Sequence, residues 1–269
     1  MRFKVLFVAF NVVLLVSFLL VFFMPALVLG WDYAGIFWSE NWPVGLIFLL
    51  MLAGLNAYFA MNWRVFSLLE LEDWAAVVSH LDERMRAAGK ISRNRARVLI
   101  NALVVSGNVE QITEIEAFLR EHQPGLIPKL SMELALPHLL SQDAKRMQRY
   151  FGELIDDRRA NDPYWVRWGL AFSLMSQSRF DDARSELSRI VTEFDDPILR
   201  PLAAHMLDQF SDQDESVARQ VADARDSMRK QYSRERMARE LERQRQNLQV
   251  LFLASRIEEA QRWVHAGRA

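Results

Sequence analysis

The stretch that decides the fold is VRWGLAFSLMSQSRFDDARSELSRIVTEFDDP, residues 166–197. Its apolar side chains form two runs, namely Val166, Leu170, Ala171 and Leu174, followed by Phe180, Ala183, Leu187 and Ile190. Spacings of three and four residues place such side chains on one face of an amphipathic helix. Because a polar segment separates the runs and Pro197 closes the stretch, the pattern predicts two antiparallel helices joined by a short turn.

The same pattern returns at a fixed interval along the chain. Segments that match the second helix are centred on Trp74, Val109, Ala144 and Phe180, which lie about 35 residues apart. Each centre is followed three residues later by an apolar residue, and the last three segments are preceded by a further apolar-periodic helix. Residues 63–212 are therefore predicted to form a stack of helix pairs. A generic helical bundle with an accidental period is the alternative.

These residues resemble the tetratricopeptide repeat (TPR) family over roughly residues 61–212. Leu170 and Ala171 stand where that family has a leucine paired with a small residue. Phe180 and Ala183 match its aromatic residue and alanine, and Pro197 is near its closing proline. The resemblance implies an all-α solenoid in which stacked helix pairs bury a continuous core.

The other units depart from the family pattern. Ile100 and Ile112 occupy positions that are usually small, which predicts wider helix packing in the second unit. Pro137 lies inside the first helix of the third unit and predicts a kink. The first unit has only its second helix, so its first helix would be the continuation of a membrane helix through residues 64–69.

The TPR resemblance also implies a groove, lined by the first helices, that binds a peptide or a partner helix. Carried over by position, the partner-binding residues are Asn94, Arg97, Asn101, Lys129, Met132, Leu136, Trp165, Trp168 and Phe172. Trp165 and Trp168 share a helix face and suit the role of binding anchors. A core position between repeats explains these two tryptophans equally well.

Residues 1–62 predict a transmembrane hairpin. Val5–Phe23 and Val44–Met61 are runs of apolar residues, and about 20 such residues cross a bilayer as a helix. A cleaved signal peptide and a buried soluble helix are the respective alternatives, but the first run is long for a signal peptide. Asn11 and Asn56 are expected to hydrogen-bond across the helix pair, or alternatively to mark an intramembrane site.

The residues that flank the two runs predict their orientation. Trp31, Tyr33, Trp38 and Trp42 lie between the runs and Trp63 follows the second, as expected of headgroup-level aromatics. Arg2, Lys4 and Arg64 flank the hairpin, whereas the connection carries no basic residue. The positive-inside rule therefore predicts both termini in the cytoplasm, with the hairpin in the bacterial inner membrane.

Residues 213–269 form a charged helical tail. From Arg225 onward it holds 11 Lys and Arg residues against 6 Asp and Glu residues, followed by a more apolar helical stretch. Three roles remain open. The tail could cap the solenoid, contact anionic lipid, or bind a partner helix.

Composition and motifs narrow the function class. The 269 residues include no cysteine, and their net charge of −1 gives no general basis for nucleic-acid binding. The sequence has no catalytic, phosphate-binding or metal motif, so no enzyme activity, cofactor, metal or small-molecule substrate is predicted. The layout is similar to that of HemY-type proteins, which place a membrane hairpin before TPR repeats.

These observations favour a membrane-anchored scaffold or adaptor that binds a protein partner. Tethering would raise the local concentration of the binding surface near membrane partners. Two alternatives remain open, which are a structural or assembly subunit whose main interface is the hairpin, and a membrane enzyme.

Overall fold

The computed structural model describes residues 3–141 and 143–266, and the described residues are helical and contain no strand. Arg2, which enters the orientation argument, lies outside them, as do the side chains of Lys4 and Tyr33. The chain forms two compact units, Met1–Arg84 and Met85–Ala269. The all-α fold predicted from the sequence is confirmed.

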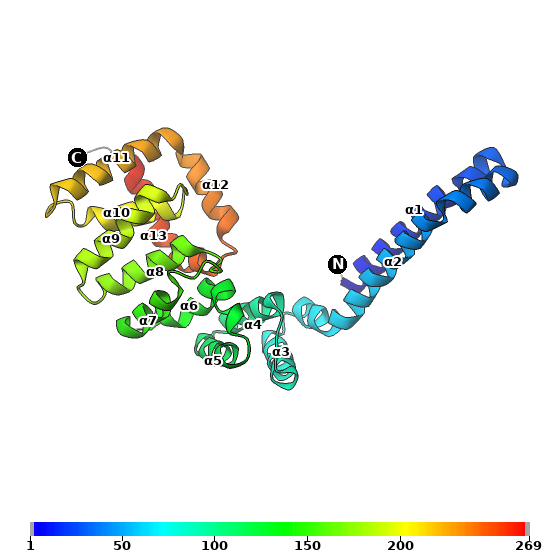
Figure 1. Ribbon diagram of the computed structural model, residues 1–269, viewed down its shortest axis with the longest axis horizontal. Helices are drawn as coiled ribbons and strands as arrows, with labels where there is room; N and C mark the ends of the chain where they lie inside the picture. Colours follow the sequence, from blue (N-terminus) through cyan, green and yellow to red (C-terminus); the bar gives the residue numbers. More distant parts are fainter. Residues whose placement is uncertain (1–2, 142, 267–269) are drawn as a thin grey trace. The chain divides into compact units, whose positions relative to one another are not determined.

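The first unit is built from two long apolar helices, α1 (Phe3–Leu29) and α2 (Trp31–Glu70), which pack against each other (Figure 1). Both are long and apolar enough to cross a membrane, and very few of their side chains are buried. As predicted, α2 continues without a break past Arg64. The predicted boundary at residue 62 therefore falls inside a helix.

The connection between the two helices is much shorter than the sequence predicted. The predicted spans left residues 24–43 as a connection, but only Gly30 separates α1 from α2, and its φ of 88° favours glycine. Pro25 and Pro43 lie inside the helices rather than ending them. In an apolar environment a helix satisfies the main-chain polar groups internally, which favours continuing it through these positions.

Aromatic side chains gather at both ends of this helix pair. At one end, the Trp38 indole packs against Phe23 and Trp31, and its Nε1 donates to the carbonyl of Phe22 at 2.9 Å. At the other end, Phe7 packs against Phe59 and Trp63. Trp38 and Trp63 are about 37 Å apart along α2 at 1.5 Å per residue, which matches a hydrocarbon core with its two interfaces.

Asn11 and Asn56 form the predicted hydrogen bond between the two helices, with Asn56 Nδ2 donating to Asn11 Oδ1 at 2.8 Å. Asn11→Leu and Asn56→Leu are each expected to weaken helix pairing by about 1 kcal/mol, with much less than additive loss in the double variant. Unfolding of the full chain by SDS in mixed micelles measures the loss. Asn41→Leu is the control, because Asn41 donates only to Phe37 of its own helix. Unchanged unfolding in both single variants would contradict the pairing.

The remaining helices are α3 (Trp74–Ala88), α4 (Arg93–Val105), α5 (Ile112–His122), α6 (Ser131–Leu140), α7 (Ala144–Leu154), α8 (Pro163–Met175), α9 (Phe180–Glu193), α10 (Leu199–Asp208), α11 (Glu215–Gln231), α12 (Arg234–Gln244) and α13 (Leu248–His265). Three short 3-10 turns, Val109–Gln111, Pro124–Leu126 and Pro128–Leu130, lie between them. Side chains cap several N-termini, among them Ser92 for α4 and Asp143 for α7, and Pro163 is the first residue of α8.

The helix starts follow the repeat found in the sequence. Trp74, Ala144 and Phe180 are the first residues of α3, α7 and α9, and Val109 opens the 3-10 turn that leads into α5. Each helix from α5 to α10 packs against the next in the chain, up to α11. Alternate helices also meet, α4 on α6 and α6 on α8, and we call the face formed by α4, α6, α8 and α10 the inner face.

The C-terminal helices fold back onto the stack. The predicted boundary after residue 212 falls in the turn between α10 and α11, which pack together. α13 then returns and packs against α10 and α6, so it covers part of the inner face (Figure 1). Val250, Ile257, Ala260 and Val264 of α13 are fully buried. The apolar stretch of the tail is thus part of the core of the second unit.

Candidate partner-binding site

The structure divides the nine predicted groove residues into two groups. Asn94, Asn101 and Lys129 are exposed, and Arg97 and Phe172 are half-buried. Met132, Leu136, Trp165 and Trp168 are between 1% and 7% exposed. The second group cannot touch a partner unless the inner face opens.

The two tryptophans occupy the core position that was the alternative interpretation of the sequence. The Trp168 ring stacks on Phe172, and its Nε1 points to Met206 Sδ of α10 at 3.2 Å. Trp165 packs edge-on against Trp168. These contacts join α8 to α10 and leave little of either ring accessible. The sequence showed that both tryptophans share a helix face, but not what covers that face.

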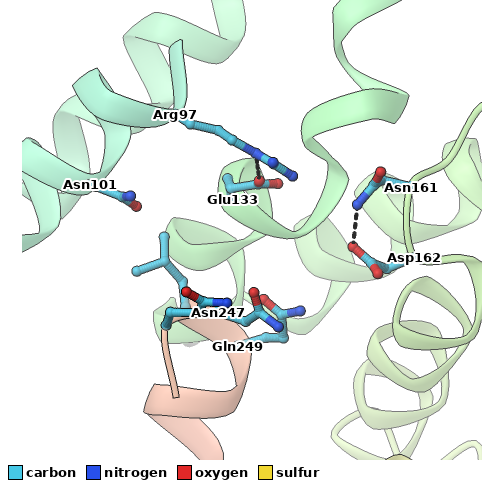
Figure 2. A pocket seen from close by; sticks show the side chains of 9 residues that line it. Arg97, Asn101, Glu133, Asn161, Asp162, Asn247 and Gln249 are labelled. Carbon is cyan, nitrogen blue, oxygen red and sulfur yellow. Dashed lines mark hydrogen bonds and ion pairs between the residues drawn. The ribbon is translucent and has the colours of Figure 1, made fainter. Parts of the chain in front are cut away.

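Two of the accessible groove residues, Arg97 and Asn101, line a polar cavity of about 600 Å³ in the second unit. The other lining residues are Glu133, Asn161, Asp162, Gln246, Asn247, Leu248 and Gln249. Figure 2 shows Arg97 and Asn101 from α4 on one side, Asn161 and Asp162 on the other, and Asn247 and Gln249 at the start of α13. We call this the amide cavity, because five of its side chains are carboxamides.

Charged groups in the amide cavity are already balanced in part. Arg97 Nε donates to Glu133 Oε1 at 2.6 Å, and the Glu133 side chain is only 14% exposed. Asn161 bridges two neighbours, since its Nδ2 donates to Asp162 Oδ2 at 2.9 Å and its Oδ1 accepts from Arg93 Nη2 at 2.6 Å. The cavity therefore offers both donors and acceptors, with carboxylates on two sides and one paired guanidinium.

The N-terminus of α13 supplies further donors. Asn247 precedes the helix, and its side chain makes no capping hydrogen bond. The first backbone N–H groups of a helix have no partner within the helix. Gln249 is 7% exposed, and among residues 3–141 and 143–266 no hydrogen bond reaches its carboxamide. The cavity is thus lined by several hydrogen-bond donors and by a carboxamide that makes no hydrogen bond within the described residues.

The sequence could not have placed α13 at this site. The amphipathic pattern of residues 250–264 predicts the helix, but its spacing does not reveal which face of the stack covers it. Gln246–Gln249 lie about 150 residues from Arg97, so only the return of the chain brings them together. Arg97 and Asn101 were found because the TPR resemblance assigns them by position to the groove.

Several arginines of the basic tail form ion pairs with glutamates of the same tail. Arg243 pairs with Glu240, Arg245 with Glu242 and Glu258, and Arg256 with Glu259. Such neighbours reduce the local potential that would attract anionic lipid. Lipid contact by the tail stays a prediction.

A second polar cluster, which is buried, ties three helices together. Glu116 of α5 is 6% exposed, and its carboxylate lies 2.7 Å from His138 Nε2 of α6 and 2.8 Å from Arg120 Nε. The His138 ring stacks on Tyr150 of α7, whose hydroxyl donates to the Ser131 carbonyl at 2.6 Å. None of its residues lines the amide cavity. We interpret it as structural.

Comparison with known proteins gives two matches. A family model described as "Uncharacterised Treponema protein" matches residues 111–266. An uncharacterized protein of Treponema pallidum (strain Nichols) is 25% identical over 283 aligned residues, which cover 98% of this chain and 88% of that protein. No solved structure matches. The matched region of the family model runs from the end of the first 3-10 turn to the end of α13, so it includes most of the second unit.

Proposed function

The chain belongs to the family described as "Uncharacterised Treponema protein", and we propose that it is a membrane-anchored, TPR-like scaffold that binds a protein partner. The hairpin of α1 and α2 holds the protein in the inner membrane with both termini in the cytoplasm. The helical body then presents the amide cavity to a partner at the cytoplasmic face. The role is non-catalytic, and anchoring raises the encounter rate with other membrane proteins.

The anchor is supported by the length, apolarity and exposure of α1 and α2, together with the aromatic side chains at both ends of the pair. The orientation rests on the basic residues that flank the hairpin, since Arg64 follows the apolar part of α2 whereas Asp32 and Glu40 lie near the turn.

The likeness to TPR proteins is supported by the regular helix starts and by the packing of alternate helices into one layer. The observation that carries the proposal is the amide cavity. Arg97 and Asn101, two residues that the resemblance assigns to the groove, remain accessible there while α13 covers other parts of the inner face. Carboxamide side chains can donate and accept at once, which suits the N–H and C=O groups of a polypeptide.

The main test is partner capture in the native cell. A photo-crosslinking residue at position 101 is expected to trap a discrete partner, whereas the same residue at exposed position 149 on α7 is not. The double variant Arg97→Ala/Asn101→Ala should lower capture by about tenfold, because it removes the accessible polar groups of α4. Affinity purification and quantitative mass spectrometry measure the yield, with unchanged helicity by circular dichroism as the folding check.

Arg149→Ala is the matched control, since it removes an exposed arginine from α7 without touching the amide cavity. Equal capture by all variants would show that the cavity does not bind the partner. Replacing residues 1–62 with an unrelated hairpin addresses the alternative function. Capture that disappears after this swap would identify the hairpin as the main interface, as expected of an assembly subunit.

A further inference from the structure

The N-terminus of α13 opens into the amide cavity rather than into the core. α13 packs on α10 and α6, and its first residues, Leu248 and Gln249, line the cavity. Figure 2 shows Gln249 and the preceding Asn247 across the cavity from Arg97 of α4. Asn101 of α4 is exposed across this space. The part of the inner face next to α4 is therefore not covered by α13. A ligand in the cavity would contact the N-terminal end of α13.

The backbone N–H groups and the Gln249 carboxamide at this end of α13 can donate hydrogen bonds to oxygen acceptors. The backbone N–H groups of its first turn have no partner within the helix, and the Asn247 side chain does not cap them. Gln249 is 7% exposed and lines the cavity, and no hydrogen bond within the described part of the chain reaches its carboxamide. A bound acceptor would give this amide a hydrogen bond within a partly enclosed site, where such bonds are stronger than in bulk water.

The charge of the amide cavity limits what the acceptor can be. Glu133 and Asp162 are both carboxylates. Of the two nearby guanidinium groups, Arg97 is bonded to Glu133 and Arg93 is bonded to Asn161. A fully charged anion such as a phosphate would be repelled by the two carboxylates. The carbonyl groups at the C-terminus of an α-helix carry only about half a negative charge in total, so they suit the site better.

We propose that the amide cavity binds the C-terminal turn of a partner α-helix that carries a basic side chain in that turn. This inference rests on the proposed function and names the partner segment. The last carbonyls of a helix lack internal partners, so they accept from the first N–H groups of α13 and from Gln249. The two helix dipoles then lie head to tail, and the lysine or arginine pairs with Asp162.

The second unit already contains a helix C-terminus that is held in a similar way. At the other end of α13, Arg225 Nη2 donates to the Trp263 carbonyl at 2.6 Å, and Arg229 Nε donates to the Val264 carbonyl. Side-chain donors of neighbouring helices thus satisfy the last carbonyls there. In the amide cavity, Gln249 and Asn101 would serve a partner helix as these arginines serve α13.

The test uses the full chain in detergent micelles and a labelled, stapled alanine-rich helix of about 15 residues with lysines in its last turn. A second peptide has the same composition but carries the lysines in its first turn. Fluorescence anisotropy should show about fivefold tighter binding of the first peptide. Gln249→Leu and Asp162→Asn should each weaken its binding by about fivefold, whereas Arg149→Ala should not.

Equal binding of the two peptides, or full affinity in both cavity variants, would overturn the proposal. Gln249→Leu should not lower the melting temperature, since it removes an amide that makes no hydrogen bond within the described residues. If this variant nevertheless unfolds the second unit, peptide binding by Asp162→Asn decides whether the proposal holds. Crosslinking at position 101 separates this proposal from the general one. Partner capture without any preference for the helix with C-terminal lysines refutes helix-end binding and leaves the scaffold function standing, whereas absent capture refutes the scaffold itself.

Discussion

Gly169→Ala is expected to destabilise the second unit by about 3 kcal/mol, because the added methyl group has nowhere to go. A Cβ at position 169 of α8 would lie 2.3 Å from Cζ and 2.5 Å from two further ring atoms of Phe151 in α7. Phe151 is fully buried, so its ring cannot move aside without displacing other core side chains. Chemical denaturation of the full chain in detergent, followed by circular dichroism, measures the loss.

Gly152→Ala in α7 is the matched control for this substitution. Gly152 is exposed and a Cβ there meets no atom within 4 Å, so alanine should stabilise the helix by up to about 1 kcal/mol. The same glycine-to-alanine change is therefore expected to raise stability in α7 and to lower it in the neighbouring helix α8. Phe151→Leu in the Gly169→Ala background should restore part of the loss. Similar stability of the two alanine variants would show that α7 and α8 do not approach as closely as described.

Glu116→Gln is expected to cost about 3 kcal/mol, since it leaves the buried His138 and the more exposed Arg120 without their shared carboxylate. Glu153→Gln is the control. Glu153 bonds the same arginine at 2.8 Å, but its side chain is 45% exposed, so its loss should cost less than about 1 kcal/mol. Thermal and chemical unfolding of both variants give the comparison. Equal and small losses would mean that the buried pair contributes little.

The effect of Glu116→Gln should also depend on pH. Burial alone would raise the pKa of the Glu116 carboxyl, but hydrogen bonds from His138 and Arg120 outweigh it, and the pKa lies below the 4.5 of an unperturbed glutamate. The folded state therefore favours the ionised form. Its contribution is complete above the unfolded pKa and is lost as the pH falls through the folded value. The stability gap between the parent chain and Glu116→Gln should narrow below about pH 4.5.

Local sequence patterns predicted the elements of this fold well. The apolar periodicity placed Trp74, Ala144 and Phe180, and each begins a helix. The Asn11–Asn56 pair was predicted because lone polar side chains in two apolar runs have few other partners. These features depend on spacing within a segment, or on one contact between polar side chains in otherwise apolar helices.

Features that depend on how distant segments meet were not predicted. The one-residue turn at Gly30 depends on helical continuation through Pro43, which the sequence rules disfavour. The burial of Trp165 and Trp168 depends on the neighbouring helices of the inner face and on the later segments of the chain that pack against that face. Four of the nine residues that line the amide cavity come from the tail, and no periodicity in the sequence shows that residues 97 and 249 line the same cavity.

The packing of α13 against α6 affects how the second unit folds and unfolds. In an open repeat array, every contact is between neighbours, so the ends can fray while the middle persists. Here α13, near the end of the chain, packs against α6, which lies more than 100 residues earlier. Because of this contact, the array is closed between its end and its middle, and loss of α13 would expose α6 in the middle of the stack. We therefore expect all-or-none melting and slow assembly, because the closing contact forms only after the whole stack has been synthesised.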